Sequence, residues 1–315
     1  MTADPKHLPT FSHYMGIDWS GAKTPKRSHS IAVSQCSSGQ LQSNRQCSAL
    51  MAAPTALEHK LSREDVFDIL SDAVTSSRRT LVGIDCNFGY CQSVAHAQFY
   101  NNITAQKLWH EINTLCQHEN NYFAGEVWTS SALAKHFWCE GKQPNWFNAK
   151  QLRRVTEQAA ADSGLGIPES PFKLIGAKQV GKGGLAGMRL LHHLKTNFAD
   201  KVAIWPFEAS LTDTATLVIC EIYPRLFIRY AKYGNQKVRS IKELNTILKR
   251  LGTAPYADAN AHESDSLNDH LTDAIISSAG LRWFTECMTE MQPLSTYHLP
   301  PAATTVEGWI FGIPR

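Results

Sequence analysis

Two short hydrophobic runs in this chain each end on an aspartate that follows a glycine by two positions. The first, MGIDWSGA, contains Asp18, and the second, VGIDCNFG, contains Asp85. Burying a carboxylate at the end of an apolar strand is costly unless the charge is paired. Side chains alternate along a strand, so Gly16 should share a face with Asp18, and Gly83 with Asp85. The glycine leaves room for another group to approach the backbone beside each acid.

Further acids lie later in the chain. Glu221 ends the strand-like run TLVICE, and DHLTDA places His270 and Asp273 three residues apart, on one side of a predicted helix. If Asp18, Asp85 and Asp273 converge, two carboxylates ~4 Å apart repel by roughly 4 kcal/mol at an effective dielectric of 20. Oxygen ligands of this kind suit Mg²⁺ or Mn²⁺, and a pair of such ions can activate water against a phosphodiester. Alternatively, each aspartate is a turn residue or a helix cap.

The predicted elements alternate between strands and helices and indicate an α/β protein. Strands are predicted at 14–19, 30–36, 41–47, 79–85, 202–208 and 215–224. Helices are predicted at 61–77, 104–117, 129–139, 151–162, 225–232, 240–251 and 268–288, and the segment 181–198 is predicted to be a glycine-rich loop that enters a helix. No linker-like or repeated segment interrupts this order. We therefore expect a single domain over 1–315, with a helical insertion over about 90–200, after the fourth strand.

The composition is that of a globular protein. Of the 315 residues, 43% are hydrophobic and 19% charged, which argues against a disordered chain, and the net charge of +3 permits a nucleic-acid partner without demanding one. No signal peptide and no apolar run of about 18 residues is found, so we expect a cytoplasmic protein with no membrane partner. Eight cysteines without C-x-x-C spacing indicate neither a disulfide framework nor a Cys-rich zinc site.

Three strands, a helix, a fourth and a fifth strand and a late helix resemble the ribonuclease H-like order. HLTDA at the start of the late helix is similar to the [HD]-x-x-D-A pattern of Holliday-junction resolvases. More specifically, GIDWSGAK, VGIDCNFG, CEIYPRLF, DHLTDA and EGWIFGIP resemble domain-of-unknown-function family four-two-nine, whose members are predicted ribonuclease H-like nucleases. The resemblance extends over nearly the whole chain. It implies a mixed sheet flanked by helices and a metal-dependent nuclease that hydrolyses phosphodiester bonds of nucleic acid.

The resemblance also implies roles for single residues. Asp18, Asp85 and Asp273 match its metal-binding acids, His270 matches a position that is His or Asp in resolvases, and Glu221 matches the strand-five acid. Together these five are the candidate catalytic residues. The chain departs from the family pattern after Asp85, where Cys-Asn-Phe-Gly replaces the usual proline-containing IDAP. That departure concerns the loop beside the site.

Several basic residues are candidates for contacts with substrate phosphates. One pair lies in AKTPKRS, beside the first acid, where a solvated loop is the alternative. Another opens the glycine-rich GKGGLAG helix, whose free amides suit an anion, although the segment is no Walker loop and a plain helix start is the alternative. The last follows Glu221 and pairs either with a phosphate or with that acid. These candidates are Lys23, Arg27, Lys182 and Arg225.

The insertion interleaves tryptophans with basic residues, which suits base stacking and phosphate contacts but also an ordinary core. The residues concerned are Trp109, Trp128, Trp138, Trp146, Lys135, Lys142, Lys150, Arg153 and Arg154. Glu307, before the apolar end of the chain, is either a surface acid or an indirect contributor to the site.

Two other functions remain open. The first is an actin-like or sugar-kinase-type ATP-binding phosphotransferase, which shares a first-strand aspartate but needs a second half and a second phosphate loop that are not found after residue 200. The second is a non-catalytic binding module on the same scaffold.

Overall fold

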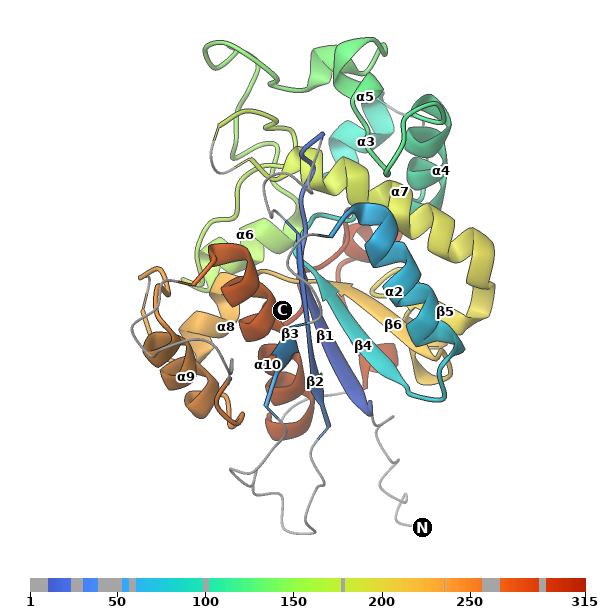
Figure 1. Ribbon diagram of the computed structural model, residues 1–315. Coiled ribbons are helices and arrows are strands. Elements are labelled where there is room, and N and C mark those ends of the chain that lie inside the picture. Colours follow the sequence, from blue (N-terminus) through green and yellow to red (C-terminus); the bar gives the residue numbers. More distant parts are fainter. Residues whose placement is uncertain are drawn as a thin grey trace, which may run out of the picture.

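A mixed six-stranded sheet forms the centre of the protein, with helices on both faces (Figure 1). The computed structural model describes residues 11–23, 31–38, 53–56, 61–98, 102–176, 179–234, 236–256, 267–288 and 293–315. The strand order is β3-β2-β1-β4-β6-β5; the β1–β2 and β2–β3 pairs are antiparallel, and the other three pairs are parallel. The strands are β1 (His13–Asp18), β2 (Ala32–Ser37), β3 (Thr55–Ala56), β4 (Thr80–Ile84), β5 (Val202–Ile204) and β6 (Leu217–Glu221). The predicted α/β class is confirmed, whereas the strand predicted at 41–47 lies outside the described residues.

The two faces of the sheet pack on different helices. Met15 and Ile17 of β1 belong to a core shared with α2 and α7, while Tyr14 belongs to a second core shared with α8, α9 and α10. The helices that cover the sheet are α2 (Arg63–Thr75), α7 (Gly181–Phe198), α8 (Pro224–Tyr230), α9 (Ile241–Arg250) and α10 (Asp269–Cys287). The alternation predicted for β1 is therefore confirmed, and Gly16 and Asp18 belong to the face that α10 covers.

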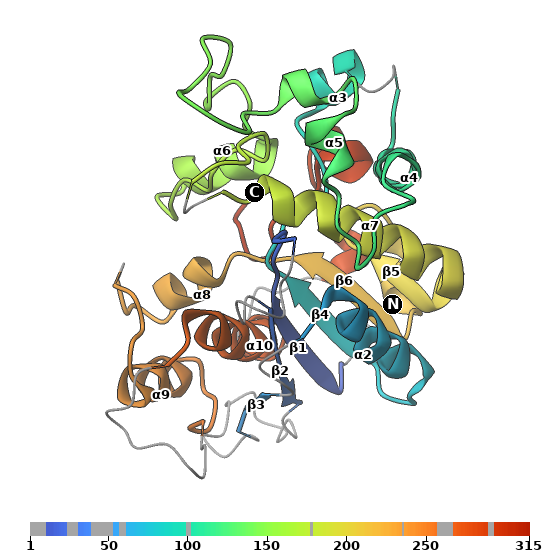
Figure 2. The same ribbon diagram turned by 45° about the horizontal axis from the view of Figure 1, so that its top comes forward.

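The insertion after β4 lies over the carboxyl ends of β1 and β4 (Figures 1 and 2). Its helices are α3 (Gln92–Gln98), α4 (Ala105–Leu115), α5 (Glu126–Thr129) and α6 (Val155–Asp162), with the 3-10 turn η1 (Ala134–His136). The helix predicted at 129–139 is wrong. Ser131 Oγ accepts a hydrogen bond from the Leu133 amide and donates one to the Val127 carbonyl, so a serine side chain competes with the helical backbone pattern at this point.

The last residues of the chain return to the carboxyl end of the sheet. Ile310 forms a parallel bridge with Glu221, and the Phe311 amide donates to the Glu221 carbonyl at 2.8 Å. Trp309, Ile310 and Phe311 are buried. Just before them runs the π-helical turn η5 (Ala303–Glu307); earlier come the 3-10 turns η2 (Ala199–Lys201), η3 (Ala209–Asp213) and η4 (Leu294–Thr296).

Two further predictions from composition are tested by the structure. No helix in the described ranges is long and apolar enough to cross a bilayer. Cys287 is disulfide-bonded, while the other cysteines within the described ranges are free thiols. The free cysteines are Cys36, Cys86, Cys91, Cys116, Cys139 and Cys220.

Candidate functional site

Three carboxylates reach one end of the sheet from three separate elements. Asp18 ends β1, Asp85 directly follows β4, and Asp273 lies in the second turn of α10. Because β1 and β4 are parallel neighbours, their carboxyl ends meet at one edge, where the Asp85 amide donates to the Ile17 carbonyl at 2.9 Å. The two strand-end acids predicted from the sequence therefore lie on adjacent strands.

Small residues allow α10 to come close to β1 and bring its acid to this edge. A Cβ at Gly16 would lie 2.4 Å from the Ala274 carbonyl oxygen and 2.6 Å from the Ser278 amide nitrogen. On the neighbouring strand, Ser34 Oγ and Ser278 Oγ lie 3.1 Å apart. The glycine before the first acid thus makes room for the backbone of a helix. At Gly83, the corresponding space is filled by side chains of Ile222 and Leu281.

The acids raise one another's pKa values. Burial raises the pKa of Asp85 well above its usual value, and the negative charges of Asp18, Asp273 and Glu221 raise it further. Burial likewise raises the pKa of Asp273 to about 7, with Asp18 and Asp269 adding to the shift. No described residue forms a hydrogen bond or ion pair with the side chain of Asp85 or Asp273. These two carboxylates therefore have no hydrogen-bonded or ion-paired partner within the described ranges, although the charges of Arg225 and His270 act on Asp273.

Asp18 differs because His270 is its partner. Asp18 Oδ2 contacts His270 Nδ1 directly, across 252 positions of sequence. Burial raises the pKa of Asp18 although this hydrogen bond opposes the shift, and the same bond raises the pKa of His270. The Asn268 side chain caps α10 by accepting the His270 amide at 3.0 Å. The Asp18 carboxylate and the His270 imidazole can therefore share one proton in this hydrogen bond.

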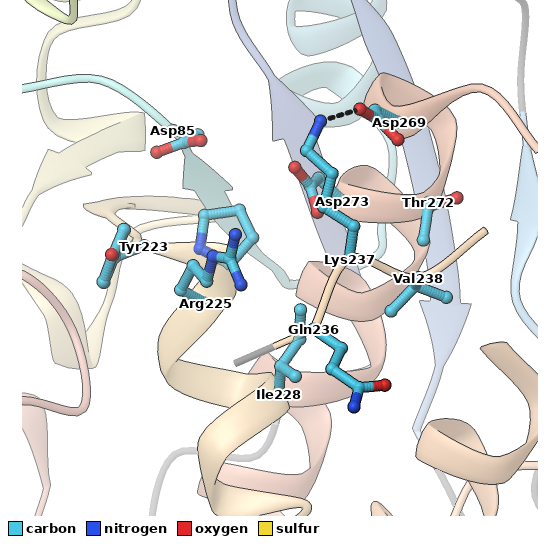
Figure 3. A pocket seen from close by; sticks show the side chains of 11 residues that line it. Asp85, Tyr223, Arg225, Ile228, Gln236, Lys237, Val238, Asp269, Thr272 and Asp273 are labelled. Carbon is cyan, nitrogen blue, oxygen red and sulfur yellow. Dashed lines mark hydrogen bonds and ion pairs between the residues drawn. The ribbon is translucent and has the colours of Figure 1, made fainter. Parts of the chain in front are cut away.

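A cavity of about 160 Å³ opens beside these acids (Figure 3). Asp85 and Asp273 lie on opposite sides of the Arg225 guanidinium in this view, and Lys237 is ion-paired with Asp269 at the outer edge. The positive charge of Arg225 lowers the pKa of Asp273, in opposition to the larger effect of burial. The cavity therefore combines carboxylates with cationic groups able to contact a phosphate.

The donor chemistry of this site suits a hard divalent cation, but the side chains do not form a closed coordination shell. Within the described parts of the chain, no group of three or more His, Cys, Asp or Glu side chains is positioned to hold a metal ion. Mg²⁺ is commonly held through only one or two carboxylates, with water or substrate oxygens completing its shell. Asp85 and Asp273 fit that open arrangement, since neither has another described partner.

Glu221 occupies a buried network next to the site. Arg154, only 1% exposed, forms ion pairs with Glu221 and Glu157, and its Nη1 donates to the Glu307 carbonyl at 2.7 Å. The Phe88 amide donates to Glu221 Oε2 at 3.2 Å. Burial raises the pKa of Glu221, while Arg154 opposes the shift. The observed partner of Glu221 is thus Arg154, one of the basic residues that the sequence interleaves with the tryptophans of the insertion.

Glu307 is a connecting residue at the end of the chain and not a surface acid. Its side chain is buried and accepts the Gln92 amide at 2.7 Å and the Val155 amide at 2.6 Å. Glu307 therefore joins the start of α3 to the start of α6. The Arg154–Glu157 pair is local, with a spacing of three residues, whereas Glu221 and Glu307 reach Arg154 from distant segments that no local pattern indicates.

The remaining cationic candidates are spread over the molecule. Lys23 Nζ lies 6.0 Å from the Phe123 ring centroid and Lys182 Nζ lies 5.4 Å from that of Trp128, so both side chains face the insertion. Neither lines the cavity beside Asp85. Arg27 lies outside the described residues. Arg225 is the candidate cation that the structure brings next to the acids.

The tryptophans of the insertion mostly pack within it. Trp109 is buried, and its Nε1 donates to the Phe88 carbonyl at 2.7 Å. Trp128 contacts the Phe123 ring edge to face, and Trp138 contacts Phe147 in the same way. This favours the core interpretation of these aromatic residues, whereas Trp146 is exposed.

No protein-family model matches this chain. No curated protein matches it, and no solved structure does.

Proposed function

We propose that this protein is a metal-dependent phosphodiesterase that acts on nucleic acid. The observation that carries the proposal is the pair Asp85 and Asp273. These two carboxylates have raised pKa values, lie near a third at Asp18, and form no hydrogen bond or ion pair within the described ranges. Leaving such charges unpaired is costly in the free protein. A divalent cation would remove that cost and explain why three elements deliver acids to one edge.

We further propose that the fold is ribonuclease H-like, as the resemblance to family four-two-nine implies. The antiparallel β3-β2-β1 portion, continued by parallel β4 and β6, is compatible with that order of strands. The insertion after β4 also follows the expectation from the sequence. Family membership itself remains a proposal.

In the proposed mechanism, Asp85 and Asp273 would hold the cation and Arg225 would orient the substrate phosphate from the same cavity. When bound, Mg²⁺ or Mn²⁺ supplies charge neutralisation at the phosphate and a lowered pKa for an attacking water. His270, whose pKa is raised by its hydrogen bond with Asp18, would be the residue to donate a proton to a departing oxygen. A two-metal version of the site needs Asp18 as a ligand too, and hence the loss of its contact with His270.

A non-catalytic binding module is the second candidate. It is favoured by the absence, within the described ranges, of three side chains grouped around one ion position. The same cavity would then bind an anionic ligand through Arg225 and Lys237, without turnover. The two candidates differ in whether Mn²⁺ binds and whether phosphodiesters are cleaved.

The experiment compares Asp85→Asn and Asp273→Asn with Asp269→Asn. The last is a matched control, because Asp269 lines the same cavity but is exposed and already paired with Lys237. We expect the first two variants to lose Mn²⁺ binding, measured by calorimetry, and to lose Mn²⁺-dependent cleavage of a labelled oligonucleotide, while the control keeps both. Circular dichroism verifies the fold of each variant.

Wild-type protein that binds no Mn²⁺ and cleaves no diester would contradict the proposal and leave the binding module. Thermal stabilisation by Mg-ATP, without any effect of Mn²⁺ alone, would instead indicate the actin-like or sugar-kinase-type phosphotransferase.

A further inference from the structure

A second cavity, of about 330 Å³, adjoins the cavity of the acids. The two share Asp85, Tyr223 and Arg225 as lining residues. Its volume lies in the range of about 300–1,000 Å³ that is typical of small-ligand sites. A ligand that contacts Arg225 from the first cavity can therefore extend past it into the second.

Exposed apolar side chains gather at this second cavity. Four large apolar residues of the described chain are exposed, and two of them, Ile167 at 60% and Val180 at 36%, line it together with Pro168 and Pro171. Ile167 and Pro168 lie in the loop after α6, and Val180 lies at the start of α7. Apolar side chains held together in water at a cavity mark a surface for an apolar ligand group.

Tyr223 supplies an aromatic ring at the junction of the two cavities. The ring is half-buried, and none of the described aromatic side chains stacks on it. In Figure 3, Tyr223 lies below Asp85 and beside Arg225. Stacking on an aromatic ring is how proteins commonly hold an unpaired base, and it requires no particular base identity.

The charges of the second cavity select against another phosphate. Four carboxylates line it, those of Asp85, Glu157, Glu169 and Glu221, against the two guanidinium groups of Arg154 and Arg225. A neutral group with hydrogen-bond donors is therefore preferred over an anion. A nucleobase combines a flat apolar face with such donors, whereas a sugar phosphate does not.

We propose that the second cavity holds the base of an unpaired nucleotide next to the phosphate that Arg225 binds. This inference rests on the proposed function and specifies its substrate class as single-stranded nucleic acid. A base inside a duplex is paired and stacked, so it must leave the helix before it can enter a cavity, and that costs free energy. An unpaired nucleotide avoids this cost.

The test uses a variant that alters only exposed side chains. Ile167→Ala combined with Val180→Ala trims the cavity, and Leu115→Ala is the matched control, since Leu115 is as exposed as Val180, at 36%, but lines neither cavity. Tyr223→Leu removes the proposed stacking surface. The first measurement is binding of adenosine, an uncharged probe, by NMR titration, with ribose 5-phosphate as the comparison. The second is the ratio of kcat/KM for single-stranded over duplex oligonucleotide in Mn²⁺.

We expect adenosine to bind more tightly than ribose 5-phosphate, and the two cavity variants to weaken adenosine binding by roughly ten-fold, as for the loss of one base contact. We also expect single strands to be cleaved preferentially, with that preference reduced in the cavity variants and retained in the control.

Metal-dependent cleavage with equal rates for both substrates and no adenosine binding overturns the inference and leaves the proposed function intact. Adenosine binding that depends on the cavity, without any cleavage, supports the base site and rejects the phosphodiesterase. The absence of both activities rejects both proposals.

Discussion

The glycines that precede the two strand-end acids allow a graded test of how the site is assembled. At Gly16, an added Cβ would meet backbone atoms of α10, the Ala274 oxygen at 2.4 Å and the Ser278 nitrogen at 2.6 Å. At Gly83, the nearest atom is a side-chain methyl, Ile222 Cγ2 at 2.5 Å. Backbone atoms of a packed helix cannot rotate away, whereas a side-chain methyl can. We therefore expect Gly16→Ala to be the more damaging substitution.

The magnitude follows from these distances. Restoring a normal separation of about 3.5 Å at Gly16 requires α10 to withdraw by roughly 1 Å. Overpacking of this kind costs about 1–3 kcal/mol, and replacing glycine by alanine regains about 0.4–1 kcal/mol through the unfolded chain. The net loss in the free energy of unfolding is thus roughly 1 kcal/mol, within a range of about 0–2.6 kcal/mol. Because α10 carries Asp273 and His270, the same displacement is expected to lower metal-dependent cleavage by about 100-fold.

Urea unfolding and cleavage assays on three variants check this reasoning. Gly183→Ala is the control, since its Cβ would have no neighbour nearer than 3.8 Å and its place within α7 favours alanine by about 0.5–1 kcal/mol. We expect stability to rank Gly183→Ala highest, then Gly83→Ala, then Gly16→Ala. A Gly16→Ala protein as stable and as active as wild type would show that α10 does not lie against β1 as described.

Two further predictions concern charge. Glu221→Gln should lower the free energy of unfolding by about 3–5 kcal/mol, because it breaks a buried ion pair with Arg154. Lys237→Ala, which breaks an exposed ion pair, should lower it by only about 0–1 kcal/mol in the same urea titration. Equal effects of the two substitutions would contradict the stabilising role of the buried Glu221–Arg154 pair. The pKa of Asp273 is raised from 3.8 to about 7, so its folded form binds the extra proton. Its contribution to stability is therefore present below about pH 4 and lost as the pH rises to about 7, while Mn²⁺ affinity should increase over the upper part of that range. Asp273→Asn should flatten the dependence of stability on pH, and an unchanged profile would refute the assignment.

Much of the local structure could be predicted from periodicity. The segment 181–198, predicted to be a glycine-rich loop that enters a helix, is helical over its whole length, and the strands predicted around Asp18 and Asp85 are observed within a residue or two at each end. The wrong prediction at 129–139 has a local cause, since the hydroxyl of Ser131 competes for backbone hydrogen bonds at this point of the chain. The order of helices and strands could therefore be predicted from the sequence, because backbone hydrogen bonding and the alternation of side chains between faces act over short distances along the chain.

The sequence by itself determined which strands end at an acidic residue, which residues share a face of the sheet, and that a glycine leaves room beside each acid. Only the tertiary structure decided which partner each charge has. Asp18 contacts His270 across 252 positions, and Glu221 pairs with Arg154 across 67. Such pairings depend on which helix packs on which strand, and no local spacing encodes that choice. The two cavities at Asp85 have the same origin, because their walls come from segments that are distant in the sequence: α8 and α10 line the first, and the insertion lines part of the second.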